Sequence, residues 1–522
     1  MKGAWSRTTR TRHFRHAGST DSKGTCMSRA GARRSTRAAR LSAPIAAVVL
    51  LTGGLTALSL GPAAAAPAKV GVADDFNGDG YGDLVVGAPN AKVSGKARAG
   101  YVTVLYGSKS GASAAKKKLI SRSTSGVPGA ATANQRFGST FTKGDLDRDG
   151  YGDLVIAGGT AGSVILWGSA SGLTGGTSIA KFGSAPQAGD FDGDGKTDLA
   201  LFSAQDISGD DPEGAPAALW KGPISRAAKP AAVLPLLDKS LWWGWYEDDA
   251  SCATGHGCEN GPSSITGPVV SGQVGDVNGD GRDDLVQWYY TGDGTWGNRL
   301  LLGGASGFKR GFAPGDDVTR AAAGTGVGDV NGDGYDDVVV GADGWTDQVR
   351  VAYGSPTGTS ESNVQTFDQN LPGFPGAQEE GDLVGSAVSV ADVTGDGYAD
   401  LALGIAYEDV GDITNTGSVA LVPGSAAGVT GAGTQVFHQN TAGVPGAAEA
   451  EDKFGTTTAL VDLDGNGHPD LAVGAPAENS DNGAVWVLPG TTTGLTTTSA
   501  LAFGPGDVSA PATDAMFGAF LR

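Results

Sequence analysis

The sequence is poor in the residues on which most catalytic sites depend. Only three of its 522 residues are cysteines and five are histidines. No G-x-S-x-G or H-E-x-x-H pattern is present, and these patterns mark an activated serine and a catalytic zinc site. Apolar residues do not recur at a helical period anywhere after residue 66. We therefore predict no catalytic residue, no organic cofactor and no helical domain.

Positive charge is scarce outside the N-terminus. The chain carries 37 Lys and Arg against 56 Asp and Glu, a net charge of −19. Residues 1–40 hold eleven of the basic residues and one acid, which leaves 26 basic and 55 acidic residues and a net charge near −29. Binding to a phosphate backbone needs a basic face. We therefore predict no nucleic-acid partner, and cations are the natural counter-charge.

Only one long apolar run occurs, and it lies near the N-terminus. Residues 41–60 form this run, after the basic stretch 29–40 and before the small residues Ala63–Ala65. This order is typical of a secretory signal peptide. We expect residues 1–66 to be removed, with Met27 as an alternative start, and the mature chain to be secreted into the extracellular space without a membrane anchor. The other interpretation is a retained membrane anchor.

Two cysteines, Cys252 and Cys258, remain after the predicted signal. In an exported protein such a pair suggests a disulfide that closes a short loop. The alternative is a metal site, but two sulfurs with His256 lack a fourth ligand.

What the sequence does contain is an acidic nine-residue loop, repeated seven times. The first copy, Asp75–Asp83, reads D-F-N-G-D-G-Y-G-D, with oxygen-bearing side chains at positions 1, 3, 5 and 9. At position 6, Gly80 allows the sharp turn of an ion-binding loop, where we expect a Cβ to be in the way. The copies start about 65 residues apart on average. This period predicts a repeat architecture in which neighbouring units bury each other's faces.

These loops are candidate calcium sites. Calcium accepts six to eight oxygen ligands at flexible geometry, whereas magnesium demands a stricter octahedron. Position 7 would offer its backbone carbonyl, so its side chain should point away from the ion, which makes Lys196 and Arg282 tolerable. The alternative is a set of Asp/Asn-Gly turns without an ion. The sixth and seventh copies differ most from the pattern of the acidic loop, because they have Thr394 at position 3 and Asn466 at position 5.

The predicted metal-binding residues are Asp75, Asn77, Asp79, Tyr81, Asp83, Asp145, Asp147, Asp149, Tyr151, Asp153, Asp190, Asp192, Asp194, Lys196, Asp198, Asp276, Asn278, Asp280, Arg282, Asp284, Asp329, Asn331, Asp333, Tyr335, Asp337, Asp392, Thr394, Asp396, Tyr398, Asp400, Asp462, Asp464, Asn466, His468 and Asp470.

Each loop runs into a short apolar strand such as Leu84–Val86, and a second strand ending in Gly follows. Alternating apolar and small residues between Gly, Asn and Asp clusters are typical of strands. Seven such units predict an all-β, seven-bladed β-propeller over residues 67–522. The first unit lacks the Phe-Gly strand that precedes other loops, and Phe517-Gly518 near the C-terminus has no loop behind it. We predict that this C-terminal strand completes the first blade and closes the ring.

The succession of Phe-Gly, D-x-[DN]-x-D-G-x-x-D and Gly-Ala-Pro resembles the FG-GAP repeat of the integrin α-subunit N-terminal propeller and its secreted bacterial relatives. Gly87-Ala88-Pro89 and Gly474-Ala475-Pro476 match the last motif fully, whereas Gly341-Ala342-Asp343 and Gly404-Ile405-Ala406 are degenerate. The resemblance implies a seven-bladed propeller with calcium in its blade loops and partner binding on one face. This chain has more such loops than the integrin pattern usually fills.

An insertion at about 223–270 breaks the repeat. It contains Trp242, Trp243, Trp245 and Tyr246, followed by acidic residues. Exposed aromatic side chains can stack on sugars or anchor a partner, and the alternative is that they pack the insertion onto the ring. We predict a monomeric, calcium-stabilised scaffold for binding or adhesion to a protein or glycan. The alternative is an exported hydrolase or lyase built on the same propeller.

Overall fold

The computed structural model describes residues 72–207, 210–244, 252, 258–270, 272–315, 324–342 and 347–522. The predicted signal peptide at residues 1–66, with Met27, lies outside the described residues, as do Trp245, Tyr246 and His256. Across the part of the chain that is described, no helix is long and apolar enough to cross a membrane.

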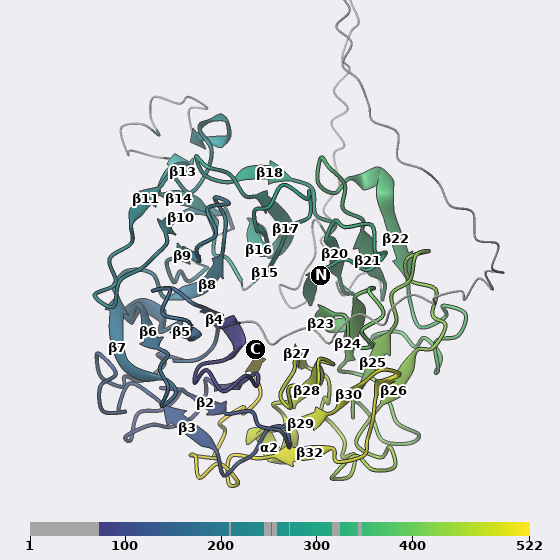
Figure 1. Ribbon diagram of the computed structural model, residues 1–522. Coiled ribbons are helices and arrows are strands. Elements are labelled where there is room, and N and C mark those ends of the chain that lie inside the picture. The colour runs from purple at the N-terminus through teal and green to yellow at the C-terminus, as the bar shows by residue number, and fades with distance from the viewer. Residues whose placement is uncertain are drawn as a thin grey trace, which may run out of the picture. The chain divides into compact units, whose positions relative to one another are not determined.

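The described chain forms seven antiparallel sheets, each built on four strands and arranged in succession around a common centre (Figure 1). The innermost strands of successive sheets contact one another. This is the predicted seven-bladed β-propeller. From the innermost strand outward, the first blade contains β33 (Phe520–Leu521), β1 (Leu84–Ala88), β2 (Tyr101–Leu105) and β3 (Lys117–Ile120), the second contains β4 (Phe141–Gly144), β5 (Asp153–Ile156), β6 (Ser163–Trp167) and β7 (Thr174–Ile179), and the third contains β8 (Ser184–Gly189), β9 (Asp198–Phe202), β10 (Glu213–Lys221) and β11 (Ala232–Leu234). The fourth blade contains β15 (Gln273–Gly275), β16 (Asp284–Gly292), β17 (Thr295–Leu302) and β18 (Lys309–Gly311), and the fifth contains β19 (Thr325–Gly328), β20 (Asp337–Val340), β21 (Val349–Ala352) and β22 (Val364–Phe367). The sixth blade contains β23 (Val384–Ala391), β24 (Asp400–Ile405), β25 (Ser418–Val422) and β26 (Gln435–Phe437), and the seventh contains β27 (Thr457–Val461), β28 (Asp470–Ala475), β29 (Ala484–Leu488) and β32 (Leu501–Phe503).

The remaining elements are short. They are the strand pairs β12 (Trp243–Gly244) with β13 (Cys258–Asn260) and β30 (Gly490–Thr491) with β31 (Gly494–Leu495), the strand β14 (Ser264–Gly267), the 3-10 turns η1 (Val72–Asp74), η2 (Gly159–Ala161), η3 (Lys239–Leu241) and η4 (Glu361–Asn363), and the single turn α2 (Glu478–Asp481).

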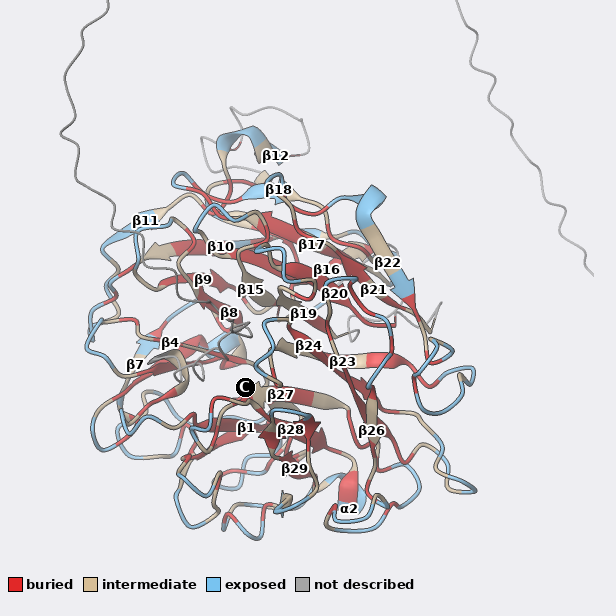
Figure 2. Ribbon diagram, turned by 45° about the vertical axis from the view of Figure 1, so that its right-hand side comes forward, coloured by how far each residue is buried: buried red, intermediate tan, exposed pale blue. Residues whose placement is uncertain are grey.

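The hydrophobic core lies between the blades. The second strand of a blade, such as β1, β5 or β9, is buried along its whole length (Figure 2). Its two faces meet different neighbours: Leu84 and Val86 pack toward the seventh blade, whereas Val85 packs toward the second. A strand covered on both faces reads as a continuous apolar run, which explains the short runs that follow each loop. The described core residues form one such cluster at each blade interface.

The C-terminal strand closes the ring, as predicted. Strand β33 pairs antiparallel with β1 and places Leu521 opposite Val86. The Phe517 side chain is fully buried, and the ring of Phe520 meets the ring of Phe141 edge to face at 4.8 Å. The first blade is therefore made from both ends of the described chain.

The Phe-Gly and Gly-Ala-Pro motifs meet across neighbouring blades. Gly138 has a left-handed φ of 85°, and its carbonyl approaches Gly87 so closely that a Cβ there would lie 2.4 Å from the oxygen. The same approach joins Gly518 to Gly474. Glycine is needed on one side for the backbone angle and on the other for space.

The predicted insertion belongs in part to the third blade. Strand β10 is nine residues long and pairs with β9, with β11 and, at its N-terminal end, with β14. Residues 232–234 and 264–267 are therefore integrated into the sheet, because the long β10 offers backbone groups beyond the reach of β9.

Candidate metal centres in the blade loops

The seven acidic loops lie at one end of the blades. In six blades the loop joins the innermost strand to the second strand, and in the first blade it follows η1. Because these connections all have the same direction, the loops share one face of the ring. Backbone hydrogen bonds join successive loops: the amide of Gly152 donates to the carbonyl of Asp75 at 2.9 Å, and the amide of Gly82 donates to the carbonyl of Asp462 at 2.8 Å. The second bond links the last loop to the first.

The first aspartate organises each loop. The carboxylate of Asp75 accepts hydrogen bonds from the amides of Gly78 at 2.6 Å and Gly80 at 2.8 Å. Gly80 has a φ of 88°, and the equivalent glycine is left-handed in every loop: Gly150, Gly195, Gly281, Gly334, Gly397 and Gly467. A Cβ on Gly80 would meet nothing within 4 Å. The predicted need for glycine at position 6 is therefore confirmed, and its cause is the left-handed backbone angle rather than contact with a distant part of the chain.

Space is the constraint at position 4. A Cβ on Gly78 would lie 2.6 Å from the ring of Tyr151, which is position 7 of the next loop. Tyr335, Tyr398 and Tyr81 lie in the same way against position-4 glycines of preceding loops. The side chain at position 7 therefore packs one loop onto its neighbour, a role that our sequence reasoning missed. A position-4 glycine in six of the seven copies was the available signal.

The aspartate at position 9 clamps the loop to its own blade. Asp83 is fully buried and accepts hydrogen bonds from the amides of Phe76 and Gly107, each at 2.9 Å. Burial raises the pKa of Asp83 to about 7. The same holds for all the other position-9 residues: Asp153, Asp198, Asp284, Asp337, Asp400 and Asp470. Ligation of a metal by these carboxylates remains a prediction.

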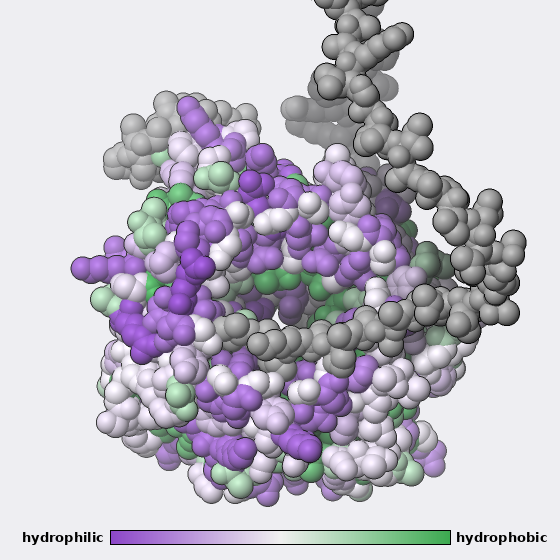
Figure 3. All heavy atoms as spheres, viewed as in Figure 1, coloured by the Kyte–Doolittle hydropathy of each residue, from purple (hydrophilic) through white to green (hydrophobic). Residues whose placement is uncertain are grey.

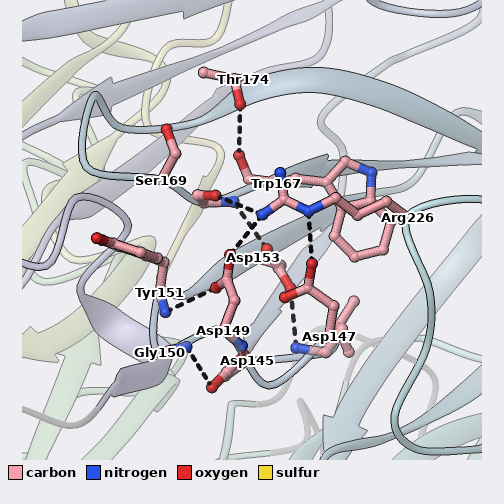
Figure 4. Close-up of polar contacts among 12 residues, drawn as sticks. Asp145, Asp147, Asp149, Gly150, Tyr151, Asp153, Trp167, Ser169, Thr174 and Arg226 are labelled. Carbon is pink, nitrogen blue, oxygen red and sulfur yellow. Dashed lines mark hydrogen bonds and ion pairs between the residues drawn. The ribbon is translucent and has the colours of Figure 1, made fainter.

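The second loop already holds a positive charge supplied by the chain (Figure 4). Carboxylate oxygens of Asp145, Asp147 and Asp149 lie within 4.8 Å of one another. The guanidinium of Arg226, from the segment after β10, donates to Asp147 at 2.6 Å and to Asp149 at 2.5 Å. It also lies 5.9 Å from the centre of the Trp167 ring. Arg226 thus occupies the side of the loop at which a cation would bind.

The third loop has a similar arrangement. Its carboxylates, Asp190, Asp192 and Asp194, form the other close acidic group among the described residues. Lys221 forms ion pairs with Asp192 and Asp194, and Lys196 pairs with Asp194. The two loops with Asp at positions 1, 3 and 5 are therefore the two that receive a cationic side chain from the end of β10 or the segment after it.

The prediction that a basic side chain at position 7 points away from the loop is wrong. Lys196 contacts Asp194, and Arg282 donates to Asp280 at 2.9 Å. The physical reason is that each faces a partly exposed carboxylate two residues away, and opposite charges at this distance attract.

Four loops have no described cationic side chain beside their carboxylates. In the first, fifth, sixth and seventh loops, no described Lys or Arg lies within ion-pair distance of the carboxylates. The amide oxygen of Asn77 is oriented by the amide of Asp79 at 2.9 Å, and the corresponding oxygens of Asn331 and Asp464 accept the same type of bond. Thr394 of the sixth loop has a buried hydroxyl without a hydrogen-bond partner in the described chain, so an oxygen donor remains available there.

Replacing Arg226 should change the number of metals bound. In an Arg226→Ala variant the carboxylates of the second loop lose their cation, and like charges this close favour binding of a replacement. We expect calorimetric titration to show one more calcium ion per chain than in the wild type. Lys229→Ala, which removes an exposed cation of the same segment, is the control and should leave the stoichiometry unchanged. Equal stoichiometry in wild type and Arg226→Ala would contradict the assignment.

Two further acidic sites were missed by the sequence reasoning. Glu408 accepts a hydrogen bond from Nε2 of Gln369 at 2.8 Å, and Glu478 accepts one from Gln439 at 2.7 Å. Burial raises the pKa of Glu408 to about 7, and neighbouring acids add to the effect. Burial and the nearby Asp452 likewise raise the pKa of Glu478. The duplicated Gln-Asn pair at 369–370 and 439–440 was the signal that could have revealed them.

These glutamates predict a pH dependence of stability. Because the folded-state pKa exceeds the unfolded value, the folded protein binds more protons, and the free energy of unfolding falls as pH rises from about 4.5 toward 7. We expect Glu408→Gln with Glu478→Gln to flatten this fall by on the order of 1 kcal/mol per site. Urea unfolding at pH 5, 6, 7 and 8 in calcium measures it. Identical slopes for wild type and variant would show that the two glutamates do not titrate in this range.

The insertion contains the predicted disulfide and two tryptophans that lie in different surroundings. Cys252 and Cys258 form the predicted disulfide, with Cα atoms 4.8 Å apart. Trp242 packs against the core between the third and fourth blades and donates its indole N–H to the carbonyl of Leu237 at 2.9 Å. Trp243 is 41% exposed. The packing interpretation therefore holds for Trp242, and Trp243 is available for contact.

The fold and its loops define the class of the protein: a β-propeller in which each blade carries an acidic loop before its second strand. Residues 66–105, 321–359, 384–422 and 454–488 match the FG-GAP repeat, and residues 145–201 match an FG-GAP-like repeat. The chain therefore contains FG-GAP repeats, as the resemblance implied.

Curated relatives match part of this chain and a smaller part of their own length. Integrin alpha pat-2 of Caenorhabditis briggsae is 33% identical over 39% of this chain and 17% of its own length. Phosphatidylinositol-glycan-specific phospholipase D of Bos taurus is 30% identical over 28% of this chain and 18% of its own length. The alignments thus span less than a fifth of either relative. Among solved structures, the BP39L lectin of Burkholderia pseudomallei aligns with a TM-score of 0.40 and 13% identity, over 79% of this chain and 96% of the lectin.

Proposed function

We propose that this protein is a secreted, calcium-binding β-propeller that acts as a scaffold for binding or adhesion to a protein or a glycan. The observation that carries the proposal is the ring of acidic loops on one face, four of which lack any described cationic partner. Such loops offer clustered oxygen ligands in a flexible arrangement, which suits calcium. Secretion is supported by the signal-like order of residues 1–66.

A bound calcium ion would also explain how the buried carboxylates at position 9 can be ionised. Burial, with a smaller contribution from neighbouring aspartates, raises the pKa of each to about 7, as it does for Asp83. A divalent cation beside the loop would favour the ionised form. In the four open loops, residues such as Asp75, Asn77 and Asp79 would hold the ion, and the ion would supply the charge that keeps these oxygens together.

The binding role is supported by the surface that the ring presents. Hydrophilic side chains gather over the blades, and hydrophobic ones line the hollow at the centre of the face in view (Figure 3). The inner strands are paired with the second strands of their blades, and the loops between blades vary in sequence. Such an arrangement suits recognition by loops on a scaffold of strands.

Arrays of printed glycans and of secreted and cell-surface proteins test this function. The mature chain in 1 mM calcium should bind a defined subset of spots, and excess EDTA should abolish the signal. Trp243→Ala, which removes an exposed side chain, should weaken binding at least tenfold for partners that use the insertion. Trp242→Phe keeps an aromatic side chain in the packed position and is the matched control. Absence of binding on both arrays would contradict the proposal.

A hydrolase built on the same ring is the second candidate. The similarity to a phosphatidylinositol-glycan-specific phospholipase D favours it, although the match covers only 18% of that enzyme. The hydrolase function is tested by incubating the protein with a glycan-linked phosphatidylinositol and analysing the products. Release of phosphatidic acid would support the hydrolase over the binding scaffold.

A further inference from the structure

A cleft of about 480 Å³ lies where the insertion meets the fourth blade. Its walls include Asn260 of β13, Tyr289 of β16, Arg299 of β17 and Arg310 of β18. A smaller hollow of about 230 Å³ adjoins it and shares Trp243 and the two arginines. Strands β12 and β18 mark the position in Figure 2.

Two arginines face this cleft without an acidic partner. Arg299 donates from Nε to Oε1 of Gln287 at 3.0 Å and from Nη2 to the carbonyl of Thr266 at 2.6 Å. Its guanidinium lies 4.0 Å from the centre of the Tyr289 ring. Among the described residues, no carboxylate lies within ion-pair distance of Arg299 or Arg310. These neutral contacts hold the Arg299 guanidinium in place and leave its charge uncompensated.

Acids outnumber bases by 55 to 26 after residue 40. Lys221 at the end of β10 and Arg226 in the segment after it each contact two carboxylates, whereas Arg299 and Arg310 contact none among the described residues. Burial, with a smaller contribution from the charge of Arg310, lowers the pKa of Arg299 to about 9. An anion in the cleft would relieve both effects. A guanidinium matches a carboxylate through two parallel hydrogen bonds.

The rest of the cleft suits a sugar ring. Trp243 is 41% exposed at the rim and can stack on the apolar face of a pyranose. Asn298 lines the wall, is only 4% exposed, and has an Oδ1 atom without a hydrogen-bond partner in the described chain. Glu259 also lines the cleft. Amide and carboxylate acceptors beside an aromatic face can bind sugar hydroxyls while the arginines bind a charged substituent.

We propose that this cleft binds a carboxylate-bearing sugar, such as a uronic acid residue of an acidic polysaccharide. The inference rests on the proposed binding function and names its ligand class. Arg299 and Arg310 would bind the carboxylate, Trp243 would stack on the ring, and Asn298 would accept a hydrogen bond from a hydroxyl.

Calorimetric titration of the mature chain in calcium with oligogalacturonate tests this inference. We expect binding that weakens with rising salt and a Kd raised at least tenfold by Arg310→Gln or Trp243→Ala, both at exposed positions that should not affect folding. Arg299→Gln should have a larger effect, and its unfolding temperature checks that the fold is intact. Arg98→Gln removes an exposed arginine of the first blade and should leave the Kd unchanged.

The comparison ligands separate the possible outcomes. Neutral galactose oligomers should bind at least tenfold more weakly, and so should acetate, which carries the charge without the ring. Equal binding of acetate or of a sulfated polysaccharide would reduce the site to a general anion site and overturn the inference, and so would an unchanged Kd in Arg310→Gln and Arg299→Gln. If oligogalacturonate fails to bind while other spots of the arrays are bound, the inference falls and the scaffold function stands.

Discussion

Deletion of residues 510–522 should lower the unfolding temperature by at least about 5 °C. The deletion removes β33 and the buried side chains of Phe517 and Leu521, which are 0% and 5% exposed. Burial of two such side chains contributes roughly 3–6 kcal/mol. The loss also opens the ring, since β33 is the innermost strand of the first blade and contacts β27 and β28 of the seventh.

A point variant separates closure from simple loss of chain. Phe517→Ala should cost about 3–5 kcal/mol because it leaves a cavity in a packed interface. Val233→Ala, on the outer strand β11 where the side chain is 63% exposed, should leave the unfolding temperature within about 1 °C. Calorimetry in the same calcium buffer measures all three proteins. A truncated protein that unfolds at the wild-type temperature would show that the C-terminal strand does not close the ring.

The sequence was sufficient to predict the blades, their second strands and the closing strand. The acidic loop repeats with its following apolar run, and both signals are local. Closure of the ring could also be predicted. The first loop lacks a preceding Phe-Gly strand and Phe517-Gly518 lacks a following loop, so the two together form one complete unit. Such internal recurrence compensates for the weakness of each motif taken alone.

The cationic partners of the second and third loops could not be predicted in this way. Arg226 lies 79 residues from Asp147 in the chain, and no local pattern around it distinguishes it from a solvated surface residue. Its position follows from the inter-blade contact in which Ile224 donates to the carbonyl of Leu146 at 2.6 Å. That contact depends on how one blade packs on the next, which a linear motif does not specify.

The two tryptophans of the insertion illustrate the same limit. Trp242 and Trp243 are adjacent in the sequence, yet one packs on the core and the other is exposed. Their alternation follows from the entry into β12, where successive side chains point to opposite sides. Composition alone could indicate an aromatic cluster and could not assign the two roles.

Removal of calcium should have the largest effect on stability. The open loops place carboxylates such as Asp75 and Asp79 four residues apart, and they repel one another without a cation. At a calcium concentration 100-fold above Kd, each site stabilises the folded state by about 2.7 kcal/mol, so four sites contribute on the order of 10 kcal/mol. For a chain of this length, this corresponds to a shift in unfolding temperature of roughly 10 °C.

Variants of single loops should show the effect site by site. Asp333→Ala in the fifth loop, which has no described cationic partner, should remove one calcium ion per chain. Asp149→Ala in the second loop, where Arg226 pairs with that carboxylate, should leave the number of bound calcium ions unchanged. Magnesium should restore less stability than calcium, because its stricter octahedral geometry fits a flexible loop poorly.

Scanning calorimetry of the full mature chain in 1 mM calcium, in excess EDTA, and after return of calcium to the EDTA-treated sample tests the central claim most directly. The account predicts a fall of roughly 10 °C in EDTA and recovery on addition of calcium. An unfolding temperature that is the same in calcium and in EDTA would contradict it.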